Sequence, residues 1–149
     1  QIEASLTPSV EKKKINPFKP KNLSNIRISC INIKGMKIGS DREEYKLNTA
    51  LDHSADIVII IDHHLDTNKL AALTKNNRQT LSRYKIYGTP SLKRGILVFV
   101  KKKSGCILSN VESLLNNDLL SFNIILPDLS IIQTAAVKPP PGMDLLKQT

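Results

Sequence analysis

Residues 55–64 read Ala-Asp-Ile-Val-Ile-Ile-Ile-Asp-His-His, and this stretch decides the predicted fold. Its five consecutive β-branched residues, 57–61, favour a strand that is buried on both faces. In open α/β sheets, ligand sites lie just outside the carboxyl ends of such strands. Asp62 follows the strand directly. It therefore stands where a metal ligand or a catalytic base would be placed.

The residues before this strand predict a βαβ unit. Residues 26–33 alternate between apolar and polar and predict a first strand, which Lys34 and Gly35 end. Ser40 and Glu43 have the spacing of a capping box, in which hydroxyl and carboxylate satisfy each other's backbone donors, so we expect a helix over about 41–53. Parallel pairing of the two strands would bring their carboxyl ends, near residues 32 and 62, to the same edge of the sheet.

The remaining sequence predicts one more helix and a series of antiparallel strands. Asp66 or Thr67 can cap a helix over about 68–79. Further strands are expected over residues 84–87, 95–100, 106–108, 119–126 and 130–137, with a hairpin through residues 101–105. These elements predict an α/β domain over residues 25–138. Residues 1–24 are expected to be a flexible basic arm and residues 139–149 a proline-rich tail.

The composition favours a polyanionic partner. In 149 residues, 22 Lys and Arg face 13 Asp and Glu, which gives a net charge of +9. Such an excess is typical of proteins that bind nucleic acid. The candidate phosphate contacts are Lys34, Lys93, Arg94, Lys101, Lys102 and Lys103. For the last three, a solvated hairpin tip that protects a sheet edge is the alternative interpretation.

Two further features bear on the surroundings of the protein. Cys30 and Cys106 each lie in a strand-like apolar run, which predicts two buried free thiols and a reducing compartment, nuclear or cytoplasmic. No apolar run reaches the length of a transmembrane helix, so no membrane partner is expected.

The Asp-His-His sequence after the central strand allows three interpretations. The first is a metal site formed by Asp62, His63 and His64 with His53. Adjacent histidines on a strand point to opposite sides, and the spacing matches no structural zinc pattern, so the first is disfavoured. In the second, the three letters resemble the signature of the metal-dependent DHH phosphoesterases. The upstream segment 32–40, however, carries no acid to supply that class's other metal ligands.

The third interpretation is a resemblance that covers about residues 26–142. Residues 32–35, Asn-Ile-Lys-Gly, resemble the Asn-x-x-Gly motif that ends the first strand of the endonuclease/exonuclease/phosphatase (DNase I-like) superfamily. Residues 56–65 resemble its strand that ends in a metal-binding acid, and residues 95–99 its Gly-Val-Ala-Ile-Leu strand. Residues 136–140 resemble its Val-Tyr-Ala-Pro segment. The set is most similar to the apurinic-type endonuclease domain of non-LTR retrotransposons.

This resemblance implies the front half of a DNase I-like α/β sandwich: one mixed sheet with two helices on one face. It also implies site residues. Asn32 would orient the scissile phosphate, and Asp62, where the family usually has Glu, would bind a Mg²⁺ or Mn²⁺ ion through a shorter side chain. Lys138 replaces the family's tyrosine and would contact phosphate as a point charge. His63 and His64 are expected to be incidental.

The family's later motifs, which supply a further Asp, an Asn and a final His, have no counterpart before residue 149. The sequence therefore predicts a truncated, metal-dependent endonuclease-like domain that is inactive alone. A half sandwich would expose the apolar face of its sheet, which predicts a protein partner or dimer mate over that face. The alternatives are a non-catalytic basic module that binds nucleic acid or protein, or a structural subunit of a larger assembly.

Overall fold

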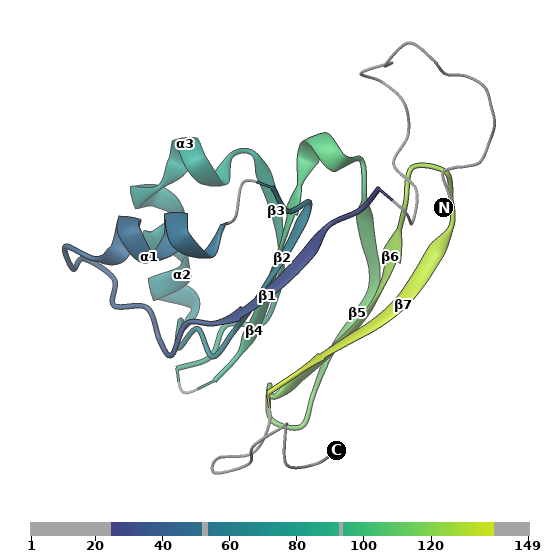
Figure 1. Ribbon diagram of the computed structural model, residues 1–149. Helices are drawn as coiled ribbons and strands as arrows, with labels where there is room; N and C mark the ends of the chain where they lie inside the picture. The colour runs from purple at the N-terminus through teal and green to yellow at the C-terminus, as the bar shows by residue number, and fades with distance from the viewer. Residues whose placement is uncertain (1–24, 52–53, 93, 139–149) are drawn as a thin grey trace, which may run out of the picture.

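A computed structural model describes residues 25–51, 54–92 and 94–138. The predicted arm and tail, His53 and Lys93 lie outside these residues. Two sheets lie face to face, and the helices cover the outer face of the larger one (Figure 1). The larger sheet has the strand order β1 (Ile28–Asn32), β2 (Ile57–Ile61), β4 (Ile96–Lys101) and β3 (Tyr84–Gly88). The smaller sheet consists of β5 (Ile107–Leu114), β6 (Leu119–Ile125) and β7 (Ile131–Val137).

Strand β2 is the centre of the larger sheet, as its Val/Ile run predicts. All five of its residues are buried. It pairs in parallel with β1, placing Asn32 opposite Ile61, and antiparallel with β4, placing Ile61 opposite Ile96. The predicted parallel pairing of the first two strands is therefore confirmed. The carboxyl ends of β1 and β2 and the start of β4 meet at one edge of the sheet.

Within the described residues, three helices cover this sheet where the sequence predicted two: α1 (Glu43–Ala50), α2 (Thr67–Asn76) and the short α3 (Arg78–Leu81). Asn77 has φ −123° and ψ 40° and separates α2 from α3 within the predicted second helix. Buried side chains of the helices, among them Leu47, Leu73 and Leu81, form one core cluster with Val58 and Phe99 of the sheet. This cluster fixes the helices on a single face.

The two predicted helix starts have different outcomes. Asp66 caps α2 as expected, because its Oδ1 accepts a hydrogen bond of 2.8 Å from the backbone N–H of Lys69. The predicted capping box of α1 is wrong. Glu43 instead accepts from the N–H of Gly39 at 2.8 Å and from the side-chain amide of Asn77 at 2.7 Å. Its carboxylate thus ties the start of α1 to the end of α2.

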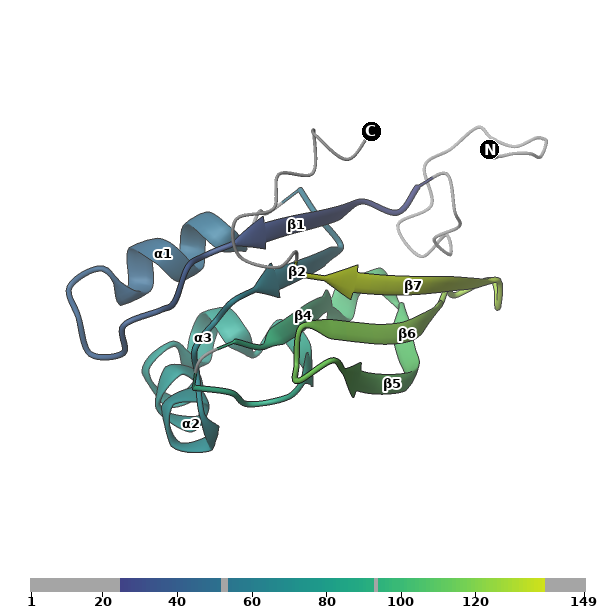
Figure 2. The same ribbon diagram turned by 90° about the horizontal axis from the view of Figure 1, so that it is seen from below.

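The α/β class is confirmed, but the prediction of one sheet with an exposed apolar face is wrong. After β4, a 3-10 turn, η1 (Lys102–Ser104), and Gly105 with φ +73° lead the chain out of the larger sheet. β5 then pairs with β6 and not with β4, so the predicted hairpin between residues 95–100 and 106–108 does not form. Figure 2 shows the resulting two layers of strands.

The second sheet covers the face that the sequence left without a partner. Alternate residues of β6 are buried, and Leu120, Phe122 and Ile124 form a second core cluster with Ile59 and Val98 of the larger sheet. The apolar face of the larger sheet is therefore covered by the smaller sheet of the same chain, and not by the partner or dimer mate that the sequence predicted.

Two smaller predictions concern the thiols and the membrane. Cys106 is buried as predicted, whereas Cys30 is exposed on the edge strand β1, and both are free. Within the part of the chain that the structure describes, no helix is long and apolar enough to cross a bilayer.

Candidate functional site

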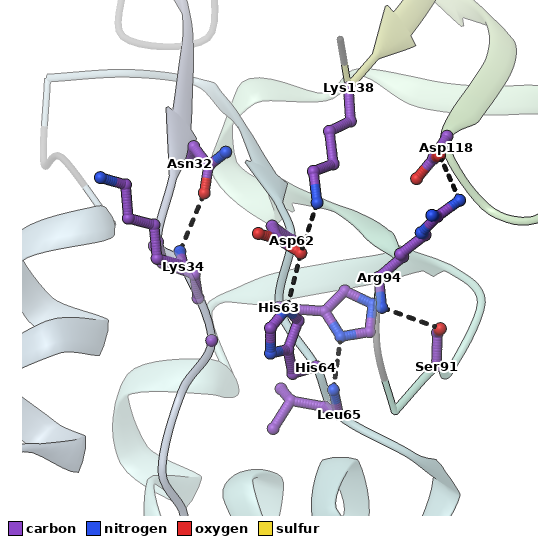
Figure 3. A network of polar contacts seen from close by, with 12 residues as sticks. Asn32, Lys34, Asp62, His63, His64, Leu65, Ser91, Arg94, Asp118 and Lys138 are labelled. Atoms are coloured by element: carbon purple, nitrogen blue, oxygen red, sulfur yellow. Dashed lines mark hydrogen bonds and ion pairs between the residues drawn. The ribbon is translucent and has the colours of Figure 1, made fainter. Parts of the chain in front are cut away.

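Asp62, at the carboxyl end of β2, meets Lys138, which follows β7 in the other sheet (Figure 3). The distance between Lys138 Nζ and Asp62 Oδ1 is 3.1 Å, and His64 Nε2 lies 2.6 Å from the same oxygen. The backbone N–H of Lys138 donates to the carbonyl of Asp118 at 2.8 Å, which holds the end of β7 in place. Two residues that the resemblance placed in one site are thus in direct contact.

The backbone around Asp62 is held in an uncommon conformation. Asp62, His64 and Lys34 have positive φ angles of 65°, 57° and 51°, a region that non-glycine residues occupy infrequently. The N–H of Asp62 donates to the carbonyl of Gly95 at 2.8 Å, and its own carbonyl accepts from the N–H of Gly35 at 2.7 Å. These hydrogen bonds, to the segment before β4 and from the loop after β1, hold the backbone of Asp62 so that its carboxylate points at Lys138.

Asn32 lies on the neighbouring strand at the same edge of the sheet (Figure 3). Its Oδ1 accepts a hydrogen bond of 2.9 Å from the N–H of Lys34, which shapes the loop after β1. The Lys34 side chain is exposed. Sequence reasoning missed Lys46, whose ammonium donates to the carbonyls of Ile33 and Gly35 at 3.1 and 2.8 Å. Lys46 of α1 therefore holds the loop after β1 in place through these two hydrogen bonds.

The carboxylate of Asp62 is ionised at neutral pH. Burial opposes its ionisation, but the hydrogen bonds from Lys138 and His64 and the positive charge of Lys138 outweigh burial, so the pKa of Asp62 lies below its usual range. Asp62 is only 8% exposed. Because Asp62 is nearly buried, its ion pair with Lys138 is screened less by dissolved salt than an ion pair on the surface would be.

The two histidines have different roles, and only one is incidental to the site. His63 is fully buried: its Nδ1 accepts from the N–H of Leu65 at 2.8 Å, and its Nε2 faces the carbonyl of Thr89 at 3.1 Å. Burial lowers the pKa of His63 and favours the neutral ring. Because Nδ1 accepts the hydrogen bond from Leu65, the ring proton is assigned to Nε2, which can donate it to the carbonyl of Thr89. With both nitrogens bonded inside the protein, His63 cannot also bind a metal. The prediction that His64 is incidental to the site is wrong, because its Nε2 contacts Asp62 directly.

The predicted basic residues that the structure describes fall into two groups at opposite ends of the larger sheet. Arg94 precedes β4 at the Asp62 end and forms an ion pair of 2.7 Å with Asp118. Because β4 runs antiparallel to β2, its last residue, Lys101, lies at the other end, followed by Lys102 and Lys103. Lys34, Arg94 and Lys138 therefore lie at the end of the larger sheet that carries Asp62. Lys101, Lys102 and Lys103 lie at the opposite end and are not part of that surface.

The side chains around Asp62 do not fit a magnesium site as they are arranged. Mg²⁺ takes about six oxygen ligands, usually waters with one or two carboxylates. Here one oxygen of Asp62 is already shared by an ammonium group and an imidazole. Among the described residues, no group of three or more His, Cys, Asp or Glu side chains could hold a metal ion. We therefore derive no metal-dependent step from this geometry.

Comparison of the sequence with models of known protein families and with curated proteins found no match. The resemblance to the DNase I-like superfamily therefore stays a prediction.

The pH dependence of stability should report the Asp62–Lys138 ion pair. Because the pKa of Asp62 is lowered on folding, its stabilising effect is present above its ordinary value of 3.8 and is lost as the pH falls through the lower, folded value. We expect Asp62→Asn to lower the free energy of unfolding at neutral pH, with a difference from the wild type that shrinks below about pH 4. Urea unfolding at a series of pH values measures this, with Asp41→Asn, at an exposed site, as the control. A difference that stays constant from neutral to acidic pH would contradict the assignment.

Proposed function

We propose that this protein binds the phosphodiester backbone of nucleic acid at the edge formed by Asn32, Lys34, His64 and Lys138, and that it does not cleave it. The observation that carries the proposal is the contact between Lys138 and Asp62, because it joins the ends of β7 and β2 into one polar site. It also gives the site's carboxylate a positive partner in place of a metal ion.

The charge and chemistry of this edge suit phosphate. Lys34 is exposed, and the side chains of Lys138 and Arg94 are 20% and 41% exposed beside their acidic partners. Lysine and arginine contacts to phosphate supply most of the affinity of sequence-independent nucleic-acid binding. Asn32 carries an amide that can donate to a phosphate oxygen.

The backbone of the site supports a role beyond packing. Three of the non-glycine residues with positive φ, Lys34, Asp62 and His64, gather at this one edge. Such conformations are costly and persist where the surrounding structure holds them, often at binding sites. The site is therefore preorganised before any ligand arrives.

A cleavage assay separates binding from catalysis. We expect no Mg²⁺-dependent nicking of supercoiled plasmid by the wild type even at high protein concentration, and no difference between the wild type and Asp62→Ala. Plasmid nicking that needs Mg²⁺ and disappears in Asp62→Ala would overturn the non-cleaving assignment and support the truncated endonuclease instead.

Self-association is a second candidate function, and it is favoured by the outer face of the smaller sheet. Ile107, Ile125 and Ile131 are opposite one another on three adjacent strands, and Ile107 and Ile131 are 48% and 61% exposed. Light scattering should show a dimer that Ile131→Lys dissociates and that Gln79→Lys, at an exposed position of α3, preserves. A monomer at all concentrations would exclude this candidate.

A further inference from the structure

Strand β1 is left without cover on the inner side of the sandwich. Within the described residues, the larger sheet has four strands and the smaller sheet three. Ile28 and Cys30 of β1 are opposite Ile57 and Ile59 of β2, so their side chains share the face that the smaller sheet covers. Ile57 and Ile59 are 0% and 5% exposed, whereas Ile28 is 43% exposed and Cys30 is exposed as well. The cover therefore ends between β2 and β1.

Strand β7 forms the edge of the smaller sheet that lies toward β1 (Figure 2). It ends at Lys138, which contacts Asp62 at the end of β2, while β5, at the other edge of the smaller sheet, lies against β3. A fourth strand of the smaller sheet, beside β7, would therefore lie over Ile28 and Cys30. We call this place the open strand position.

The backbone of β7 can pair with a strand at the open strand position. Hydrogen bonds between antiparallel strands alternate, so every second residue points its N–H and C=O groups at one neighbour. The carbonyl of Ser130, just before β7, accepts from Leu126 at 2.9 Å, and the N–H of Lys138, just after β7, donates to the strand-β6 side at 2.8 Å. The even-numbered residues of β7 therefore face β6. The residues that face the open strand position are Ile131, Gln133, Ala135 and Val137.

The edges of β1 and β7 lack the protection that the other two sheet edges have. Charged side chains and β-bulges discourage the addition of a further strand. The edge strand β3 carries the exposed Lys85, and β5 has a bulge between Ser109 and Glu112. By contrast, no residue of β1 or β7 is charged, and β7 pairs with β6 along its whole length without a bulge. The side of the molecule where β1 and β7 lie is therefore suited to strand addition.

We propose that an extended, acidic segment of another protein chain binds at the open strand position, pairing with β7 and covering β1. Its backbone would supply affinity through hydrogen bonds, and alternate apolar side chains would lie against Ile28 and Cys30. Residues 27–34 include no acidic residue, and Arg27 and Lys34 are both exposed, so acidic side chains in the segment complement this charge. This proposal does not rest on nucleic-acid binding at the Asp62 edge.

Titration of the full chain with a synthetic peptide tests the proposal. The probe has seven residues, the length of β7, and alternates valine with glutamate. We expect saturable binding below about 1 mM, followed by NMR, with slower amide exchange at Ile131, Gln133, Ala135 and Val137. Alkylation of Cys30 should slow by at least about tenfold at saturation, because the peptide covers its thiol. No binding at about 1 mM would overturn the proposal, as would protection of Cys30 by rising protein concentration alone, which would assign the position to a second copy.

Two altered peptides separate strand pairing from general adhesion. Methylation of the peptide nitrogens that would face β7 should weaken binding by about tenfold or more, because it removes the backbone donors. Exchange of glutamate for lysine should also weaken it, through repulsion by Arg27 and Lys34. Equal binding of the methylated peptide would contradict strand addition.

Matched variants of the protein place the binding at β1. Ile28→Glu puts a like charge under the acidic peptide and should weaken binding by about tenfold or more. Tyr45→Glu makes the same change of charge on α1, at a side chain that is 71% exposed, and should leave the affinity within about twofold. Equal losses in the two variants would show a general effect of charge and would contradict the assignment.

Discussion

Phe122→Ala is expected to lower the free energy of unfolding by about 3–5 kcal/mol, the usual range for removing a buried phenylalanine. Phe122 is 2% exposed on β6 and belongs to the core cluster shared by the two sheets. Its loss would leave a cavity between two layers of strands that cannot collapse freely. Equilibrium unfolding in urea measures the change.

The control is Ile131→Ala on the outer face of the same sheet. Ile131 is 61% exposed, so its truncation should change stability by less than about 1 kcal/mol. A small effect of Phe122→Ala, equal to that of Ile131→Ala, would mean that the second sheet does not pack on the first. The apolar face of the larger sheet would then need another cover.

Gly95→Ala should destabilise the protein by about 2–4 kcal/mol, through a disfavoured backbone and a steric clash together. Gly95 has φ +114°, and a Cβ atom there would lie 2.3 Å from Nε2 of the buried His63. His63 cannot move away without losing its hydrogen bonds to Thr89 and Leu65. The carbonyl of Gly95 also accepts the N–H of Asp62, so the site itself would shift.

Gly39→Ala separates the clash from the backbone cost. Gly39 has φ +82°, but no atom lies within 4 Å of the position that a Cβ would take. Its alanine variant should lose only the cost of a left-handed conformation, about 1–2 kcal/mol. If Gly95→Ala were no worse than Gly39→Ala in thermal or urea unfolding, the tight packing of His63 against Gly95 would be wrong.

The central strand of the fold could be predicted because the pattern that indicates it lies within a few consecutive residues of the sequence. An uninterrupted run of β-branched residues indicates a fully buried strand, and β2 is one. The parallel pairing of β1 with β2 follows from the strand–helix–strand order. The same reasoning correctly placed Asn32 and Asp62 at one edge.

The second sheet could not be predicted from local signals. Residues 101–105, Lys-Lys-Lys-Ser-Gly, indicate a turn, but a turn is equally compatible with a return to the same sheet or a crossing to another. The choice depends on contacts between β6 and β2, which lie about sixty residues apart in the sequence. Similarly, the capping box failed because the amide of Asn77, distant in sequence, binds Glu43.

The site was predicted in part. Asp62 and Lys138 were placed together by the resemblance, and they are in contact. His64 was missed because the two histidines were considered only as a pair of ligands to one metal ion, whereas the left-handed backbone angles of Asp62 and His64 place the imidazole on the carboxylate. The two groups of basic residues could be separated only once β4 was known to run antiparallel to β2.

The most direct measurement for the proposed function is the affinity for labelled duplex DNA at a series of salt concentrations, followed by fluorescence anisotropy, with an RNA duplex in parallel. The proposal predicts that the affinity falls steeply with salt and that Lys34→Gln reduces the slope of log K against log salt by about 1, while Lys75→Gln leaves it unchanged. The DNA should remain full length in Mg²⁺. A flat salt response, or equal slopes for the wild type and Lys34→Gln, would contradict nucleic-acid binding at the edge that Asp62 and Lys138 form.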